Sequence, residues 1–162
     1  MIIIGEKING AIPSIKQAIA ERNEALIIER TLAQAAAGAN FLDCAPSTAT
    51  EIEYETMVWL IGLMQGATNV PLCIDSPNAK LLARVVEEGH LNKPGMVNSV
   101  NEEGDKCETI FPLVAGTPWE VVGLTCDQEG IPADPAKKVD IAKRIIDKAV
   151  KYGVALNQLH ID

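Results

Sequence analysis

The chain has 162 residues, of which 48% are hydrophobic, and a formal net charge of -8, so one sizeable buried core is feasible. No stripe of Lys and Arg offers a counter-charge to a phosphate backbone, and no apolar run is long enough to cross a bilayer. Nucleic acid and membranes are thus excluded as expected partners, and we expect one cytoplasmic domain over residues 1–162.

Short apolar runs alternate along the chain with longer segments of helical period, and the runs have the character of buried strands. Strand, helix, strand order without hairpin turns predicts right-handed crossovers and a parallel sheet, either doubly wound or closed into a barrel. The expected strands are residues 2–4, 41–45, 72–76, 96–100, 121–125 and 159–162.

The intervening segments carry apolar stripes at helical spacing, which we expect to face the core. These stripes are Ile28, Leu32 and Ala35; Met57, Ile61 and Met64; and Cys107, Ile110, Phe111 and Val114. Helix ends are indicated by a capping box at Thr50 and Glu53, by N-caps at Asn78 and Asn101, and by Asp134-Pro135 with Gly153.

Strand after strand ends at or near a hydrogen-bonding side chain. In a (β/α)8 barrel the loops at the carboxyl ends of all strands converge on one ligand, whereas a doubly wound sheet concentrates polar groups at one switch point. The pattern therefore favours the α/β class and a TIM (β/α)8 barrel. The side chains concerned are Glu6, Asn9, Asp43, Asp75, Asn98, Thr125 and Asp162.

Six strands are expected, and the sequence stops on Asp162 at the tip of the sixth. We therefore expect a barrel truncated after its sixth strand, with the C-terminal strands missing. An open barrel leaves a strand edge unpaired and apolar faces uncovered. A shortened chain, a proteolytic fragment or completion by another copy would account for this.

Familiar catalytic motifs are missing from the sequence. Cys44, Cys73, Cys107 and Cys126 have neither zinc-knuckle nor disulfide-scaffold spacing, so we expect buried free thiols. Motifs for dinucleotides, nucleoside triphosphates, zinc proteases and serine hydrolases do not occur either.

Carboxylates and carboxamides are what remains to carry chemistry. A carboxylate accepts two parallel N–H bonds from an amino-pyrimidinone edge, and an Asn beside it both donates and accepts. The alternative is that Asp43 and Asp75 cap helices and that Asn98 bonds loop backbone. Three such residues at matching strand ends favour a ligand site, and we assign no role to His90 or His160.

Six segments carry a resemblance that runs in order along the whole chain. They are MIIIGEKING at 1–10, LD at 42–43, LCIDS at 72–76, MVNS at 96–99, GLT at 123–125 with GIP at 130–132, and ID at 161–162. With these segments the chain resembles the methyltetrahydrofolate:corrinoid methyltransferase family, whose domain is a pterin-binding TIM barrel. Dihydropteroate synthase and the folate domain of methionine synthase share part of the pattern.

The resemblance implies transfer of a methyl group between N5 of tetrahydrofolate and the cobalt of a corrinoid carried by a partner protein. Tetrahydrofolate or methyltetrahydrofolate is then the substrate, no metal is bound by the chain itself, and the full-length protein is a homodimer. The implied pterin-binding residues are Asp75, Asn98 and Asp162, with Glu6, Asn9 and Asp43 close by, and Asn98 is the expected catalytic residue.

Two departures from the family limit what this resemblance implies. The family's second-strand Asn is replaced near Ala45, and its catalytic Asn, on a strand beyond Asp162, has no counterpart. We therefore expect the fragment to be inactive. Three alternatives stay open: a dihydropteroate synthase-like pterin enzyme, a non-catalytic folate-binding module, and a metal-dependent lyase. The lyase would hold its cation by Glu6, Asp43, Asp75 and Asp162.

Overall fold

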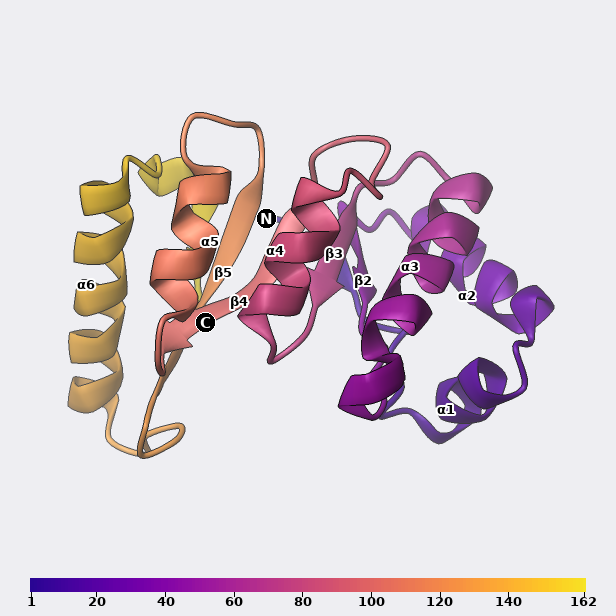
Figure 1. Ribbon diagram of the computed structural model, residues 1–162, viewed down its shortest axis with the longest axis horizontal. Coiled ribbons are helices and arrows are strands. Elements are labelled where there is room, and N and C mark those ends of the chain that lie inside the picture. Colours follow the sequence, from indigo (N-terminus) through magenta and orange to yellow (C-terminus); the bar gives the residue numbers. More distant parts are fainter.

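A computed structural model describes all residues, 1–162, and shows one six-stranded parallel sheet in the order β1-β2-β3-β4-β5-β6 (Figure 1). Each strand pairs with the next one along the chain, so the order never reverses as it does in a doubly wound sheet. This confirms the barrel prediction. The strands are β1 (Ile4–Gly5), β2 (Phe41–Cys44), β3 (Leu72–Asp75), β4 (Met96–Glu102), β5 (Glu120–Asp127) and β6 (Leu159–Ile161).

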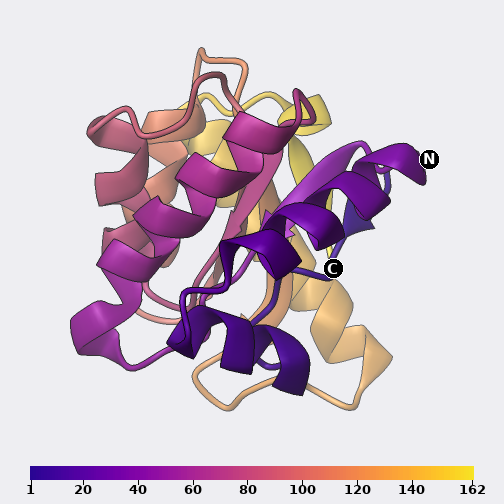
Figure 2. The same cartoon turned by 90° about the vertical axis from the view of Figure 1, so that its right-hand side faces the viewer.

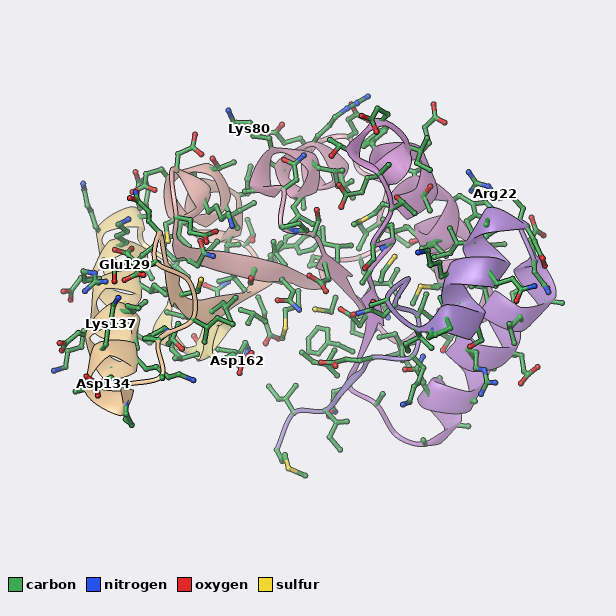
Figure 3. All side chains as sticks on the ribbon, turned by 90° about the horizontal axis from the view of Figure 1, so that it is seen from below. Arg22, Lys80, Glu129, Asp134, Lys137 and Asp162 are labelled. Carbon is green, nitrogen blue, oxygen red and sulfur yellow. The ribbon has the colours of Figure 1, made fainter.

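The helices cover the outer face of the curled sheet and leave its inner face uncovered (Figures 2 and 3). Two helices follow the first strand, and a single helix follows each of the next four. The helices are α1 (Pro13–Ala20), α2 (Glu24–Ala36), α3 (Thr50–Ala67), α4 (Ala79–Glu87), α5 (Lys106–Val114) and α6 (Pro135–Tyr152), with the 3-10 turn η1 (Leu156–Gln158) before β6.

The apolar core has two parts, one on each face of the sheet. The larger part lies between helices and sheet and includes Met57, Ile74 and Phe111, all fully buried. The smaller part lies on the inner face and consists of Phe41, Cys73, Met96 and Val122. Side chains alternate between the two faces along a strand. The inner layer therefore forms an apolar floor beneath the inner-face side chains that come two residues later, nearer the carboxyl ends of the strands.

All six predicted strands exist, but the first begins only at Ile4, because Ile2 and Ile3 are exposed and are not paired with β2 as strand residues. The strands β4 and β5 run past their predicted ends to Glu102 and Asp127. Their pairing shifts register between Asn98 and Val100 and again before Glu102. Such bulges add residues to one strand without a signal in the apolar pattern. The prediction therefore stopped where the alternation stopped.

The predicted core face of α2 is wrong. Leu32 is 46% exposed, while Thr31 and Gln34 are buried together with Ile27. The Thr31 hydroxyl donates to the Ile27 carbonyl, and the Gln34 amide oxygen accepts from the Lys7 amide at 2.7 Å. Both polar side chains have hydrogen-bond partners, so burying this face of α2 costs little free energy. The other two apolar stripes are confirmed.

Two helix starts are as predicted. The Asn78 side chain accepts from the Leu81 amide at 3.2 Å, and Asp134 accepts from the Ala136 amide at 2.9 Å. Gly153 ends α6 with a φ of 79°, in the left-handed region that favours glycine.

Two predicted caps are wrong. The helix α3 already includes Thr50, so its N-cap is Ala49, whose side chain has no hydrogen-bond acceptor, and Glu53 accepts from the Ser76 hydroxyl instead. Asn101 lies inside β4, and its amide oxygen accepts from the Glu103 amide. An Asn side chain can bond a nearby backbone amide either at a helix start or in a turn. The local sequence around Asn101 does not distinguish the two.

Two further findings concern the whole chain. The four cysteines are buried and unpaired. None of the helices combines the length and the apolar character that a membrane crossing requires.

Candidate functional site at the strand carboxyl ends

Asp43, Asp75 and Asn98 lie on the inner face of the sheet, at the carboxyl-terminal part of β2, β3 and β4. Asp43 pairs with Cys73, and Asp75 pairs directly with Asn98. Because side chains alternate along a strand, these three lie on the same face as the apolar floor, each two residues after a floor residue of its own strand. The view in Figure 3 is from this end of the strands.

Asp43 is a buried carboxyl group, only 2% exposed, whose Oδ1 has no hydrogen-bond partner. Burial, followed by the negative charges of Asp75 and Glu6, raises its pKa to about 8, against the opposing effect of a hydrogen bond with Cys73. A carboxyl group with this pKa is protonated at neutral pH and can donate a hydrogen bond. Sequence patterns gave no sign of this neutral state.

Asp75 is partly buried and differs from Asp43 in its charge. Burial raises its pKa to about 6, with further contributions from the charges of Glu6 and Glu53. At neutral pH Asp75 is therefore mostly ionised and acts as an acceptor. The carboxyl-terminal end of the sheet, which corresponds to the mouth of the barrel, thus holds a donor carboxyl and an acceptor carboxylate on adjacent strands.

Glu53 and Ser76 form a buried pair beside this site, which the sequence analysis missed because it treated Glu53 as a cap. The Ser76 hydroxyl donates to Glu53 Oε1 at 2.6 Å and accepts from the Asn78 amide at 3.0 Å. The Ser76 amide donates to the Asn98 carbonyl. The pair therefore connects α3 to the ends of β3 and β4.

Asn9 holds two loops of the mouth together. Its amide oxygen accepts from the Ala11 amide at 2.8 Å and from the Ser47 hydroxyl at 3.3 Å. Its backbone forms a bridge with Ala45, the position where the family's second-strand Asn is replaced. Asn9 is thus a connector of the β1–α1 and β2–α3 loops.

Glu6 and Asp162 occupy different parts of the same end. Glu6 is exposed, and its charge raises the pKa of both Asp43 and Asp75, so it lies near them. Asp162 follows β6, two strands beyond Asn98, and its carbonyl accepts from the Thr125 amide and hydroxyl at 2.7 Å. The pKa shifts and the strand register place Glu6, Asp43, Asp75 and Asn98 near one another, and Asp162 directly follows the edge strand β6 at the same end of the sheet.

Two other features bear on the alternatives. His160 forms a 2.5 Å contact with Glu120. The register pairs Asn98 with Val122 and Val122 with His160, so His160 lies on the same ladder of positions as Asn98, while Glu120 lies two residues before Val122. No group of three or more His, Cys, Asp or Glu side chains is arranged to hold a metal ion.

Comparison with known proteins confirms the resemblance. No family model matches the chain. Methylcorrinoid:tetrahydrofolate methyltransferase of Eubacterium limosum is 47% identical over 164 residues, covering 100% of this chain and 60% of that protein. Methionine synthase of Mycobacterium tuberculosis is 30% identical over 169 residues, covering 100% of this chain and 14% of that protein. The chain thus spans 60% of the length of the first relative and 14% of the second.

Solved structures confirm the fold. Dihydropteroate synthase from Xanthomonas albilineans in complex with 7,8-dihydropteroate superposes with a TM-score of 0.63 at 19% identity, covering 99% of this chain and 58% of that chain. The Yersinia pestis enzyme gives a TM-score of 0.65 at 18% identity, covering 99% and 59%. The curled six-stranded sheet is therefore an arrangement found in complete α/β barrels.

Proposed function

We propose that this chain forms the tetrahydrofolate-binding part of a methyltransferase that moves a methyl group between N5 of tetrahydrofolate and the cobalt of a corrinoid on a partner protein. The observation that carries the proposal is the strand register that places Asp75 beside Asn98, with the neutral carboxyl of Asp43 on the adjacent strand. The name of the 47% identical relative supports the same activity.

The mouth suits a flat heteroaromatic ring with a polar edge. Phe41, Met96 and Val122 supply an apolar floor on which such a ring packs. The Asp75 carboxylate accepts two N–H bonds from the amino-pyrimidinone edge of a pterin. The unpaired Oδ1 of Asp43 and the amide of Asn98 complete the polar edge.

Transfer of the methyl group away from N5 needs a proton or a strong hydrogen bond at that nitrogen, because an amine anion is a poor leaving group. The Asn98 amide donates a hydrogen bond without releasing a proton, so its role is to position and to stabilise. Asp43 has a pKa of about 8 and is protonated at neutral pH. We assign it the role of proton reservoir for this network.

The nucleophile is the cobalt when the methyl group leaves N5, and N5 of tetrahydrofolate in the reverse direction, so the chain itself needs none. This agrees with the thiols of Cys44 and Cys73, which lie beside the site, because burial raises the pKa of both well above the ordinary value. Thiolate is the reactive form, so these cysteines are poorly suited to attack a methyl group.

The partner and assembly follow from the resemblance alone. We propose a corrinoid protein that docks at the mouth and a homodimer for the whole protein. A dihydropteroate synthase-like activity is less well supported, because the synthase structures are similar at under 25% identity and show the fold only. The lyase and the non-catalytic module remain the alternatives to test.

Calorimetric titration with tetrahydrofolate tests the proposal. The wild-type chain, and the chain fused to the segment of the Eubacterium limosum relative that follows the matched region, are each compared with Asp75→Asn. The control is Asp140→Asn, which changes an exposed carboxylate of α6 (66% side-chain exposure). We expect the fusion to bind more tightly than the chain alone, Asp75→Asn to weaken binding at least tenfold, and chelator to change nothing.

The chemistry is measured on the same fusion by the change in absorbance of free cob(I)alamin on methylation by methyltetrahydrofolate, without oxygen. Methylation that Asn98→Ala slows supports the methyltransferase. Binding without methylation supports the folate-binding module, and binding lost with chelator supports the lyase. No binding by the fusion contradicts the pterin site altogether.

A further inference from the structure

A pocket of about 380 Å³ lies between α1 and the start of α3, at the outer rim of the mouth. This volume is in the range of small-molecule sites. No acidic side chain lines it. Its lining includes Lys16 and Ile19 of α1, Arg22 just after α1, Ser47 and Thr48 of the β2–α3 loop, and Ile52 of α3.

Two cations line this pocket without a carboxylate partner. Lys16 and Arg22 make no ion pair within 4.0 Å, although carboxylates pair with Arg84, Lys106 and Lys148 elsewhere. The Arg22 guanidinium lies 4.4 Å from the centre of the Trp59 ring, which fixes its position. Unpaired cations beside an acid-free pocket, in a chain of net charge -8, indicate an anionic ligand.

The β2–α3 loop adds uncharged donors to the same pocket. Thr48 Oγ1 is buried and has no hydrogen-bond partner. Ala49 gives α3 no side-chain cap, and although the Ile52 amide donates to the Ala49 carbonyl, the amides of Thr50 and Glu51 remain to meet an acceptor. Arg22 and Ser47, at φ values of 52° and 48°, are the two non-glycine residues with positive φ, and both line this pocket.

The pocket is connected to the proposed pterin site through Asn9 and Ser47. The Ser47 hydroxyl bonds Asn9 on the mouth side, while Ser47 also lines the pocket. Ser47 follows Asp43 by four residues, which span at most ~14 Å of extended chain. Figure 3 places Arg22 at the periphery, on the opposite side of the molecule from Lys137 of α6. A ligand seated at the mouth would need a tail that passes Ser47 to reach Arg22.

We infer that this pocket takes the γ-glutamyl tail of a polyglutamylated tetrahydrofolate, with tail carboxylates bound by Lys16 and Arg22. The inference rests on the proposed function and names the form of folate that the site prefers. The pocket is larger than inorganic phosphate needs, and Ile19 and Ile52 offer contacts to the methylene groups of such a tail. Carboxylates spaced along one chain match two separate cations.

The first test uses p-aminobenzoyl-tri-γ-glutamate, which has the tail and lacks the pterin. Trp119→Phe leaves Trp59 as the only tryptophan, and its fluorescence reports on the Arg22 contact. We expect a saturable change, weakened roughly fivefold to tenfold by Lys16→Gln and by Arg22→Gln. Lys80→Gln, which removes an exposed cation of α4, is the matched control and should not change the binding.

Several results would overturn the inference. These are the absence of a saturable change, unchanged binding in both Lys16→Gln and Arg22→Gln, and full displacement by inorganic phosphate at equal concentration. Lys16, Arg22 and Lys80 are exposed and Trp119 is partly buried, so circular dichroism is used to check that each variant is folded.

The second test separates this inference from the proposed function. Calorimetry compares tetrahydropteroyl mono- and triglutamate on wild type, Asp75→Asn and Lys16→Gln. Tighter binding of the triglutamate, lost in Lys16→Gln alone, supports the tail site. Equal binding of both forms contradicts the tail site and leaves the pterin site intact. No binding of either form contradicts both.

Discussion

Asp43 and Asp75 lie at the ends of adjacent parallel strands, yet the pKa of Asp43 is about 8 and that of Asp75 is about 6. The charge of Asp75 raises the pKa of Asp43, whereas Asp43 is still neutral when Asp75 titrates and has no charge to repel it. The order of the two ionisations therefore follows from burial. Between pH 6 and pH 8 the pair consists of one acid and one carboxylate.

Tetrahydrofolate binding should depend on pH through both groups. Binding needs Asp75 ionised and Asp43 protonated, so affinity should rise as the pH passes about 6 and fall as it passes about 8. Calorimetry between pH 5 and pH 9 on the fused chain measures this. In Asp43→Asn the affinity should still rise near pH 6 but should no longer fall near pH 8, because the amide that replaces the carboxyl stays neutral. A flat profile in the wild type would contradict the assignment.

The stability of the chain should also depend on Asp43. Its folded pKa of about 8 lies above the ordinary 3.8, so the folded state keeps a proton that the unfolded chain releases. The free energy of unfolding should then fall as pH rises from about 4 to about 8, by up to ~1.4 kcal/mol per pH unit.

Urea unfolding at pH 5.5 and pH 8.5 checks the sign. Asp43→Asn should lose less stability than the wild type over this range, by about 2 to 4 kcal/mol. Asp140→Asn, at an exposed site on α6, should follow the wild type. If Asp43→Asn and the wild type lose stability in parallel, the raised pKa is not present in solution.

The sheet could be predicted from sequence because each strand is a short apolar run ending at a polar residue, and parallel strands bring such ends to one edge. Asp75 and Asn98 illustrate this, since alternation alone places them side by side. The face of α2 could not be predicted, because Thr31 and Gln34 are buried through partners that lie far away in sequence or in the backbone.

The protonation of Asp43 was equally hidden, since it depends on how fully the surrounding strands bury the carboxyl group. The pocket beside Lys16 and Arg22 depends on how α1 and the start of α3 are placed relative to each other in the folded chain. Neither the protonation of Asp43 nor this pocket can be recognised from a short stretch of sequence. The one signal in the sequence is that residues 9–20 contain no Asp or Glu, although the chain as a whole is acidic.

The buried pair of Ser76 and Glu53 should contribute to stability. Ser76→Ala leaves the Glu53 carboxylate and the Asn78 amide without their partner, which should lower the free energy of unfolding by about 2 kcal/mol. Ser14→Ala, at an exposed position of α1, should stay within about 0.5 kcal/mol of the wild type. Thermal unfolding of both variants provides the comparison, and equal stability would show that water replaces the Ser76 hydroxyl.

The residues before α4 and α5 offer a test of capping within one chain. Asn78 accepts a hydrogen bond from the Leu81 amide, whereas Asp105, before α5, makes no side-chain cap. Asn78→Ala should therefore lower the free energy of unfolding by about 1 kcal/mol, and Asp105→Ala by much less. Because the β3–α4 loop also carries Ser76, Asn78→Ala should weaken tetrahydrofolate binding as well. Equal losses of stability in the two variants would mean that charge near the helix start, rather than the hydrogen bond, provides the stabilisation.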